Sequence, residues 1–254
     1  MRLIAPVWRS TPICGLEVIY NITPLDLHIE KLALATRWRT ANIVKNNWVS
    51  EKKASSHIQT LDKKLKGLKI APKSETKLHS VKERLFTIPR FDTTENNSLE
   101  ANSVWYVYTD GSKIENKVGC AYILYKKGKE IGSNAYKLEE FNTVYQAEMM
   151  AINRASANLK HMTNAKIVFR VDCQSVLTTL ASSTMVDELT KETIDNLNHI
   201  GRVNKVRLQW IRSHVGHKGN EAVDKLAKEA GVSGQEVPLA VPDSYIKSVF
   251  EKAI

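Results

Sequence analysis

The order of strand-like and helix-like segments between residues 104 and 231 most constrains the fold. Three runs rich in β-branched and aromatic residues come first, and Lys126-Lys127-Gly128-Lys129 predicts a tight hairpin between the second and third. Helix-like stretches with 3.6-residue apolar spacing then alternate with two further strands. The predicted strands are 104–108, 118–125, 130–138, 166–171 and 205–211, and the predicted helices are 143–159, 174–181, 186–200 and 220–230. A hairpin meander followed by βα units predicts an α/β fold, with a five-stranded mixed sheet (three antiparallel strands, then two parallel) and helices on both faces.

The first hundred residues predict a less regular region, mainly helical or partly disordered. Thr23-Pro24 is typical of a helix start, and apolar residues that include Leu25, Ile29 and Leu32 follow at helical spacing. The stretch 87–102 is polar and contains a proline, as linkers do. We therefore expect three parts, residues 1–100, a domain at 101–232, and a C-terminal tail at 233–254.

The charge of the chain favours a polyanionic partner. The net charge is +10 over 254 residues, of which +7 lies in residues 1–100. Either nucleic acid or an anionic membrane surface satisfies such a charge. No apolar run approaches the ~18–20 residues that cross a bilayer, so we expect no membrane span. The three cysteines include no CxxC pair, which argues against a disulfide framework or a cysteine zinc site and favours an intracellular protein, in the nucleus or the cytoplasm.

Four acidic residues stand where a metal site is expected. Asp110 and Asp172 directly follow two of the predicted strands, and Glu148 and Asp224 lie about one turn into two predicted helices. If those strands are adjacent and parallel, the four carboxylates converge at one edge of the sheet. Oxygen ligands select hard ions, and two Mg²⁺ ions about 3.5–4 Å apart promote in-line phosphoryl displacement by water. The alternative is four unrelated surface acids, because Asp after a strand often begins a turn or caps a helix.

Four segments carry a family resemblance. They are TDGS (109–112), YQAEMMAI (145–152), FRVDCQSVL (169–177) and WIRSHVGHKGNEAVDKLAKEAG (210–231). Together they resemble the type 1 ribonuclease H family, and more narrowly the ribonuclease H domain of insect non-LTR retrotransposon polyproteins. Residues 11–39 resemble the connector that precedes that domain. The resemblance implies an RNase H-like fold and endonucleolytic hydrolysis of the RNA strand of RNA–DNA hybrids, leaving 5′-phosphate and 3′-hydroxyl ends.

The resemblance also implies a role for each acid. Asp110 would bridge two Mg²⁺ (or Mn²⁺) ions, and Asp224 would help hold the ion that activates water. Glu148 and Asp172 would hold the ion at the leaving 3′ oxygen. His214 would assist proton movement or product release.

Recognition of the hybrid is implied at three further positions. Backbone groups of Gly111 and Ser112, together with Glu148, would contact the 2′-hydroxyl of RNA, and Thr143 would line a pocket for a DNA phosphate. The lysine-rich "basic handle" of some members is missing, since residues 181–198 hold a single lysine. Hybrid binding must then come from elsewhere in the chain or from a partner, and the oligomeric state is open. No small-molecule cofactor is expected.

Two alternatives remain. The first is a non-catalytic nucleic-acid-binding relic of a retrotransposon, because the chain has no Asp-Asp pair and therefore no polymerase site. The second is an RNase H-like 3′–5′ exonuclease, which is weaker because those enzymes lack the HxGxxGNExxD run found at residues 214–224.

Overall fold

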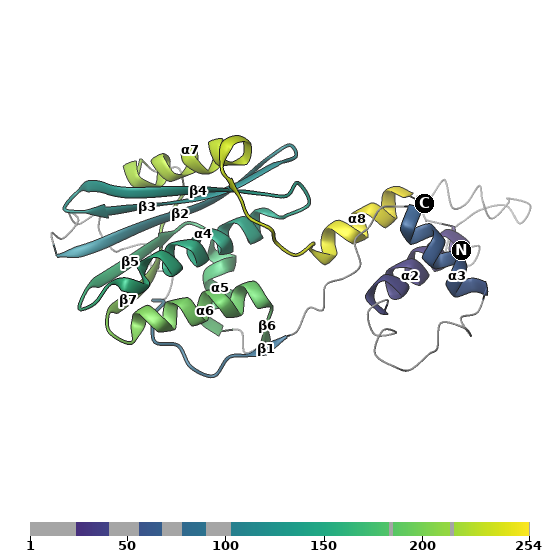
Figure 1. Ribbon diagram of the computed structural model, residues 1–254, viewed down its shortest axis with the longest axis horizontal. Helices are drawn as coiled ribbons and strands as arrows, with labels where there is room; N and C mark the ends of the chain where they lie inside the picture. Colours follow the sequence, from purple (N-terminus) through teal and green to yellow (C-terminus); the bar gives the residue numbers. More distant parts are fainter. Residues whose placement is uncertain are drawn as a thin grey trace, which may run out of the picture. The chain divides into compact units, whose positions relative to one another are not determined.

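The computed structural model describes residues 24–40, 56–67, 78–89, 103–182, 185–213 and 216–253. It divides into two compact units (Figure 1). The sheet unit spans Thr76–Ala240, and the helical unit combines Met1–Glu75 with Val241–Ile254. The sheet unit thus extends beyond the predicted range 101–232 at both ends. No helix among the described residues has the length and apolar character that crossing a membrane needs.

The sheet unit is built on one mixed six-stranded sheet with the order β7-β5-β2-β3-β4-β8. The strands are β2 (Val104–Ile114), β3 (Lys117–Lys126), β4 (Lys129–Leu138), β5 (Lys166–Val171), β7 (Lys205–Trp210) and β8 (Gln235–Glu236). Strands β2, β3 and β4 are antiparallel, whereas β5 pairs in parallel with both β2 and β7. The five predicted strands are confirmed, and the two-residue β8 adds a sixth at the edge.

One predicted strand end is wrong, and the difference matters for the site. We expected the first strand to stop at residue 108 and Asp110 to follow it, but β2 continues to Ile114. Its pairing with β3 runs unbroken through Asp110 opposite Ala121. The sequence TDGS therefore lies inside a strand and not in a turn. The reversal comes later, at Glu115, which has a positive φ of 54°.

Helices cover the two faces of the sheet unequally. Helices α4 (Val144–Asn158), α5 (Gln174–Ser182) and α6 (Glu188–Gly201) lie on one face, and α7 (Lys218–Ser233) lies on the other (Figure 1). The larger core lies between the sheet and α4–α6, with fully buried Phe169, Ile152 and Leu197. Helix α7 packs over β2, β3 and β4. It ends at Ser233, past the predicted stop at Gly231, which is itself buried within the helix.

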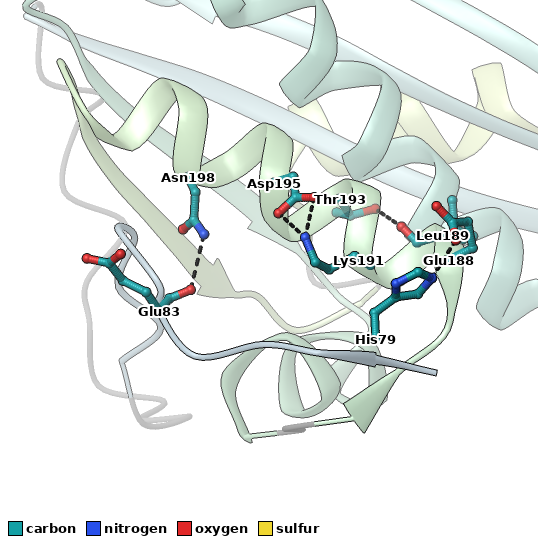
Figure 2. A network of polar contacts seen from close by, with 8 residues as sticks. All are labelled: His79, Glu83, Glu188, Leu189, Lys191, Thr193, Asp195 and Asn198. Atoms are coloured by element: carbon teal, nitrogen blue, oxygen red, sulfur yellow. Dashed lines mark hydrogen bonds and ion pairs between the residues drawn. The ribbon is translucent and has the colours of Figure 1, made fainter. Parts of the chain in front are cut away.

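A segment before the first long strand completes this unit. We call residues 78–89 the strap. Its β1 (His79–Ser80) pairs with β6 (Met185–Val186), and Thr87 pairs with the outer edge of β7 through bonds to Val206 and Leu208 of 3.1 and 2.9 Å. Figure 2 shows the contacts of the strap with α6, where Asn198 donates to the Glu83 carbonyl at 3.1 Å and His79 meets Glu188 at 2.5 Å. The strap thereby covers an edge strand that would otherwise expose unpaired backbone groups.

The helical unit has its own small core. Helices α2 (Leu25–Thr40), α3 (Ser56–Gly67) and α8 (Asp243–Ala253) bury Leu34, Trp38, Leu65, Ile246 and Phe250. Arg37 forms a two-pronged ion pair with Asp62 at 2.6 and 2.8 Å. Three residues of the predicted apolar stripe of α2, Leu25, Ile29 and Leu32, are exposed. The helix packs through Leu34 and Trp38, whose large ring buries more area.

Candidate active site

The first two acids are brought together by strand register. Strands β2 and β5 are adjacent and parallel, and Thr109 pairs with Val171. Asp110 follows Thr109 in β2 and Asp172 follows Val171 at the end of β5, so the two acids lie side by side at the carboxyl end of β5. The prediction that the two predicted strands are parallel neighbours is confirmed.

The third acid arrives from helix α4. Thr143 caps this helix, accepting from the Gln146 backbone at 3.2 Å while the Gln146 side chain accepts from the Thr143 backbone at 3.1 Å. This reciprocal pair fixes where the helix begins, and Glu148 follows about one turn later. Gly111 lets the helix approach β2, since a Cβ placed there would lie 2.4 Å from the Glu148 nitrogen. Only glycine allows such contact between the strand and the helix backbone.

Asp110, Glu148 and Asp172 form a tight acidic cluster. One oxygen from each lies within 4.8 Å of the others. Glu148 and Asp110 are buried, and Glu148 Oε2 has no hydrogen-bond partner in the part of the chain that the structure describes. Burial and the charges of Asp172 and Asp224 raise the pKa of Asp110 to about 7. Burial, then Asp110 and Asp172, raise the pKa of Glu148 well above its ordinary value. Ionised together, these groups need a cation.

The fourth predicted acid stands at the border of the cluster. Asp224 projects from α7 and accepts from Lys228 at 2.6 Å. It is outside the three-residue cluster, yet its charge contributes to the raised pKa of Asp110. The first turn of α7 is pressed onto β2, because a Cβ at Gly219 would lie 2.4 Å from the Tyr108 ring. This close packing brings Asp224 toward the acidic cluster.

Two groups around Asp172 were missed by sequence reasoning. Asn220 donates to Asp172 Oδ2 at 3.2 Å, and the Trp210 ring nitrogen donates to the Asp172 carbonyl at 3.1 Å. The Asn220 side-chain oxygen is buried and has no hydrogen-bond partner among the described residues. Asn220 belongs to the HxGxxGNExxD run, which was a signal for its importance. Its partner was hidden because the spacing of a motif does not show which strand end faces it.

The other predicted residues occupy varied places. Gly111 and Ser112 are buried within β2 and paired with β3. Thr143 caps α4, as described above. His214 lies outside the described residues, so its predicted role stays a prediction.

The donor set fits a hard divalent cation. It offers only carboxylate and amide oxygens, including the unpartnered oxygens of Glu148 and Asn220. The raised pKa values of Asp110 and Glu148 follow from mutual repulsion and burial, both of which a cation would relieve.

Comparison with known proteins agrees with this geometry. Residues 102–231, just over half of the chain, match the RNase H family. The chain belongs to the RNase H family. This RNase H chain is 30% identical over 133 residues to Ribonuclease H of Campylobacter jejuni subsp. jejuni serotype O:23/36 (strain 81-176), which covers 50% of the chain and 90% of that relative. It is 30% identical over 142 residues to Ribonuclease H of Blochmanniella pennsylvanica (strain BPEN), and this match covers 49% of the chain and 89% of that relative.

Two solved structures also align with the RNase H chain. RNase H1 from the halophilic archaeon Halobacterium salinarum NRC-1 gives a TM-score of 0.41 at 20% identity, covering 50% of this chain and 96% of that one. LC11-RNase H1, solved in complex with an RNA/DNA hybrid, gives a TM-score of 0.40 at 20% identity, covering 49% of this chain and 94% of that one.

Proposed function

We propose that this protein hydrolyses the RNA strand of RNA–DNA hybrids as a divalent-metal-dependent endonuclease, leaving 5′-phosphate and 3′-hydroxyl ends. The observation that carries the proposal is the cluster of Asp110, Glu148 and Asp172 within 4.8 Å, inside the region that matches the RNase H family. Nearby Asp224 supplies the fourth carboxylate. The ions proposed are two Mg²⁺, or Mn²⁺, because all donors are oxygens.

Each acidic residue would have its own role in binding the ions. Asp110 would touch both ions, Asp224 would help hold the one beside the attacking water, and Glu148 with Asp172 would hold the one beside the leaving oxygen. When bound, the ions supply a nucleophile at neutral pH and stabilise charge on the phosphate and the leaving oxygen. Asp110 and Glu148 must give up their protons to bind, since burial holds the pKa of each high. Asn220 orients Asp172 through its amide.

Substrate recognition is proposed for the residues that flank the cluster. Gly111 and Ser112 would contact the 2′-hydroxyl of the RNA strand through backbone groups, together with Glu148. Thr143 would face a phosphate of the DNA strand. His214 would assist proton movement or product release. Only RNA offers the 2′-hydroxyl, so contacts there select the strand that is cut.

The test is a cleavage assay with three substrates. Purified protein is incubated with end-labelled RNA–DNA hybrid, duplex DNA and duplex RNA, with Mg²⁺ or with EDTA. The proposal expects cuts only in the RNA strand of the hybrid and only with Mg²⁺. Binding of the hybrid without cleavage would reject it in favour of a non-catalytic relic, and digestion from one end would indicate an exonuclease.

The origin and location are finer proposals. Residues 11–39 resemble the connector of insect non-LTR retrotransposon polyproteins, which supports descent from such an element, and the cysteine pattern supports an intracellular location. Retrotransposon sequence flanking the gene would test the first, and fluorescence microscopy of the tagged protein would test the second.

A further inference from the structure

The face of the sheet that carries the active site is only partly covered. Helix α7 packs over β2, β3 and β4. Beyond it, Val168, Arg170, Arg207 and Gln209 of β5 and β7 are half-buried, while the residues between them are fully or largely buried against the other face. Strand residues two apart share a face, so Asp172, Arg170, Val168 and Lys166 form one column that runs from the acidic cluster to the far end of β5.

Cations concentrate at the far end of this column. Lys166 and Lys205 pair in register on the adjacent parallel strands β5 and β7, and both are exposed. A cavity of about 520 Å³ lies beside them, and Arg84 and Arg207 also line it. None of the described residues that line the cavity is acidic. Like charges directly opposite each other on neighbouring strands are unfavourable. An anion placed there would remove that repulsion.

The cavity is also lined by apolar residues. Val104, Val168 and Phe86 supply apolar atoms next to the cations. Higher in the same column, the Arg170 guanidinium lies 4.4 Å from the Tyr106 ring centroid and donates to the Tyr108 hydroxyl at 2.5 Å. A cationic and apolar surface of this kind suits a chain of phosphates and bases.

We propose that this column and its cavity bind a single-stranded extension of the RNA strand whose hybrid portion lies at the acidic cluster. This inference rests on the proposed function. Together with the neighbouring residues of β7, the column forms a strip two strands wide that spans about 20 Å from Asp172 to Lys166 at the usual rise per residue. Such a strip accommodates one flexible strand but is too narrow for a duplex to lie along it. The cavity is of the size that takes small ligands, which fits a nucleotide and not a helix.

The proposed binding surface would also compensate for the missing lysine-rich basic handle. The segment between residues 181 and 198 carries a single lysine, so α6 offers little positive charge. That lysine, Lys191, is paired with Asp195 (Figure 2). In contrast, neither Lys166 nor Lys205 forms a side-chain ion pair with a described residue. Positive charge available to nucleic acid therefore lies on the sheet and not on this helix.

The experiment compares two hybrids in a binding assay without catalysis. A blunt fluorescent hybrid and the same hybrid with a single-stranded RNA extension at either end are titrated with full-length protein in EDTA, and fluorescence anisotropy gives Kd. The test variant is Lys166→Gln/Lys205→Gln. The matched control is Lys127→Gln/Lys129→Gln, which removes the same charge from the exposed β3–β4 hairpin. Thermal unfolding verifies that both variants fold.

The expected result is specific to the extension. At about 0.1 M salt, an extension at one end should tighten wild-type binding on the order of ten-fold, and the slope of log Kd against log salt should rise by about two. Lys166→Gln/Lys205→Gln should lose both gains, and the hairpin control should keep them. The inference is overturned if the extension gives no gain in wild type, if the gain survives in the test variant, or if both hybrids weaken equally. Cleavage of the blunt hybrid by wild type with Mg²⁺ separately tests the proposed function.

Discussion

The two ends of β5 carry opposite charge in opposite surroundings. At the carboxyl end, Asp172 stands beside buried Asp110 and Glu148. At the amino end, Lys166 stands beside Lys205, and both are exposed. Each end places like charges together, but water screens the lysines and is excluded from the carboxylates. Repulsion of the same kind is therefore minor at one end and large at the other.

This contrast separates two ways to hold a ligand. The buried acids can bind a small dehydrated cation tightly, since ionising them without one is unfavourable. The exposed lysines can attract a hydrated polyanion loosely and in a salt-dependent manner. One end is suited to chemistry and the other to positioning, and variants at each should differ in magnitude accordingly.

The largest effect should come from Asp110→Asn. This change removes the carboxylate shared by the whole cluster, and we expect hydrolysis of the hybrid to fall by at least about 10³-fold, equivalent to about 4 kcal/mol of activation free energy. Initial rates on labelled hybrid with Mg²⁺ measure it. Lys228→Gln, which removes the ion-pair partner of Asp224 and keeps every carboxylate, is the control and should have a much smaller effect. Residual activity within ten-fold of wild type would contradict the role of Asp110.

The stability of the metal-free protein should fall as pH rises. The pKa of Asp110 is about 7 in the folded state against an ordinary value of 3.8, so between those values the folded state retains a proton that the unfolded state releases. Stability is then lost from about pH 4 to pH 7, by at most about 4 kcal/mol for this group. Glu148 acts in the same direction, because burial raises its pKa too.

Urea unfolding in EDTA across that pH range measures the loss. Asp110→Asn should flatten the slope and leave the metal-free protein more stable than wild type at pH 8, while Mg²⁺ should stabilise only wild type. A stability that rises with pH over this window would show that the cluster is not strained by its own charge.

How much of this site was predictable from sequence depends on the residue. Asp110, Glu148 and Asp172 were singled out from the sequence because each was predicted to lie near a strand end or a helix start, positions that topology brings to one edge. The exact end of β2 was not predictable, since Asp-Gly normally signals a turn. Here Gly111 instead serves close contact with α4, a tertiary requirement that no local pattern contains.

Contacts that depend on how elements pack together were harder still to predict. Asn220 was visible within its motif, but its bond to Asp172 depends on how α7 meets the end of β5. The strap was unexpected because its short polar and apolar stretches have no clear periodicity, and its order comes from pairing with β7. Part of the predicted α2 stripe is exposed, because periodicity indicates a helix but does not decide which of its apolar residues find packing partners.

An intermediate effect is expected at Asn220. Asn220→Ala removes the bond that orients Asp172, so we expect kcat to fall about ten-fold with a weaker apparent affinity for Mg²⁺. Asn134→Ala removes a comparable amide, bonded at 2.7 Å to the Tyr122 hydroxyl away from the acids, and should leave the Mg²⁺ dependence unchanged. Equal loss in both variants would indicate a general stability effect and no positioning role for Asn220.

The smallest effect should come from the lysine end of β5, where a single substitution should stabilise the fold slightly. Lys166→Glu turns the in-register pair with Lys205 into one of opposite charge, so the free energy of unfolding should rise by about 0.2–1 kcal/mol at low salt. Urea unfolding at low and high salt measures the gain, which should shrink as salt screens the pair. Lys127→Glu on the hairpin is the control and should change little. If Lys166→Glu stabilises the protein yet weakens binding of an RNA extension, then the pairing of Lys166 with Lys205 serves ligand binding at a small cost in folding stability. A destabilised variant would mean that the two lysines do not repel each other.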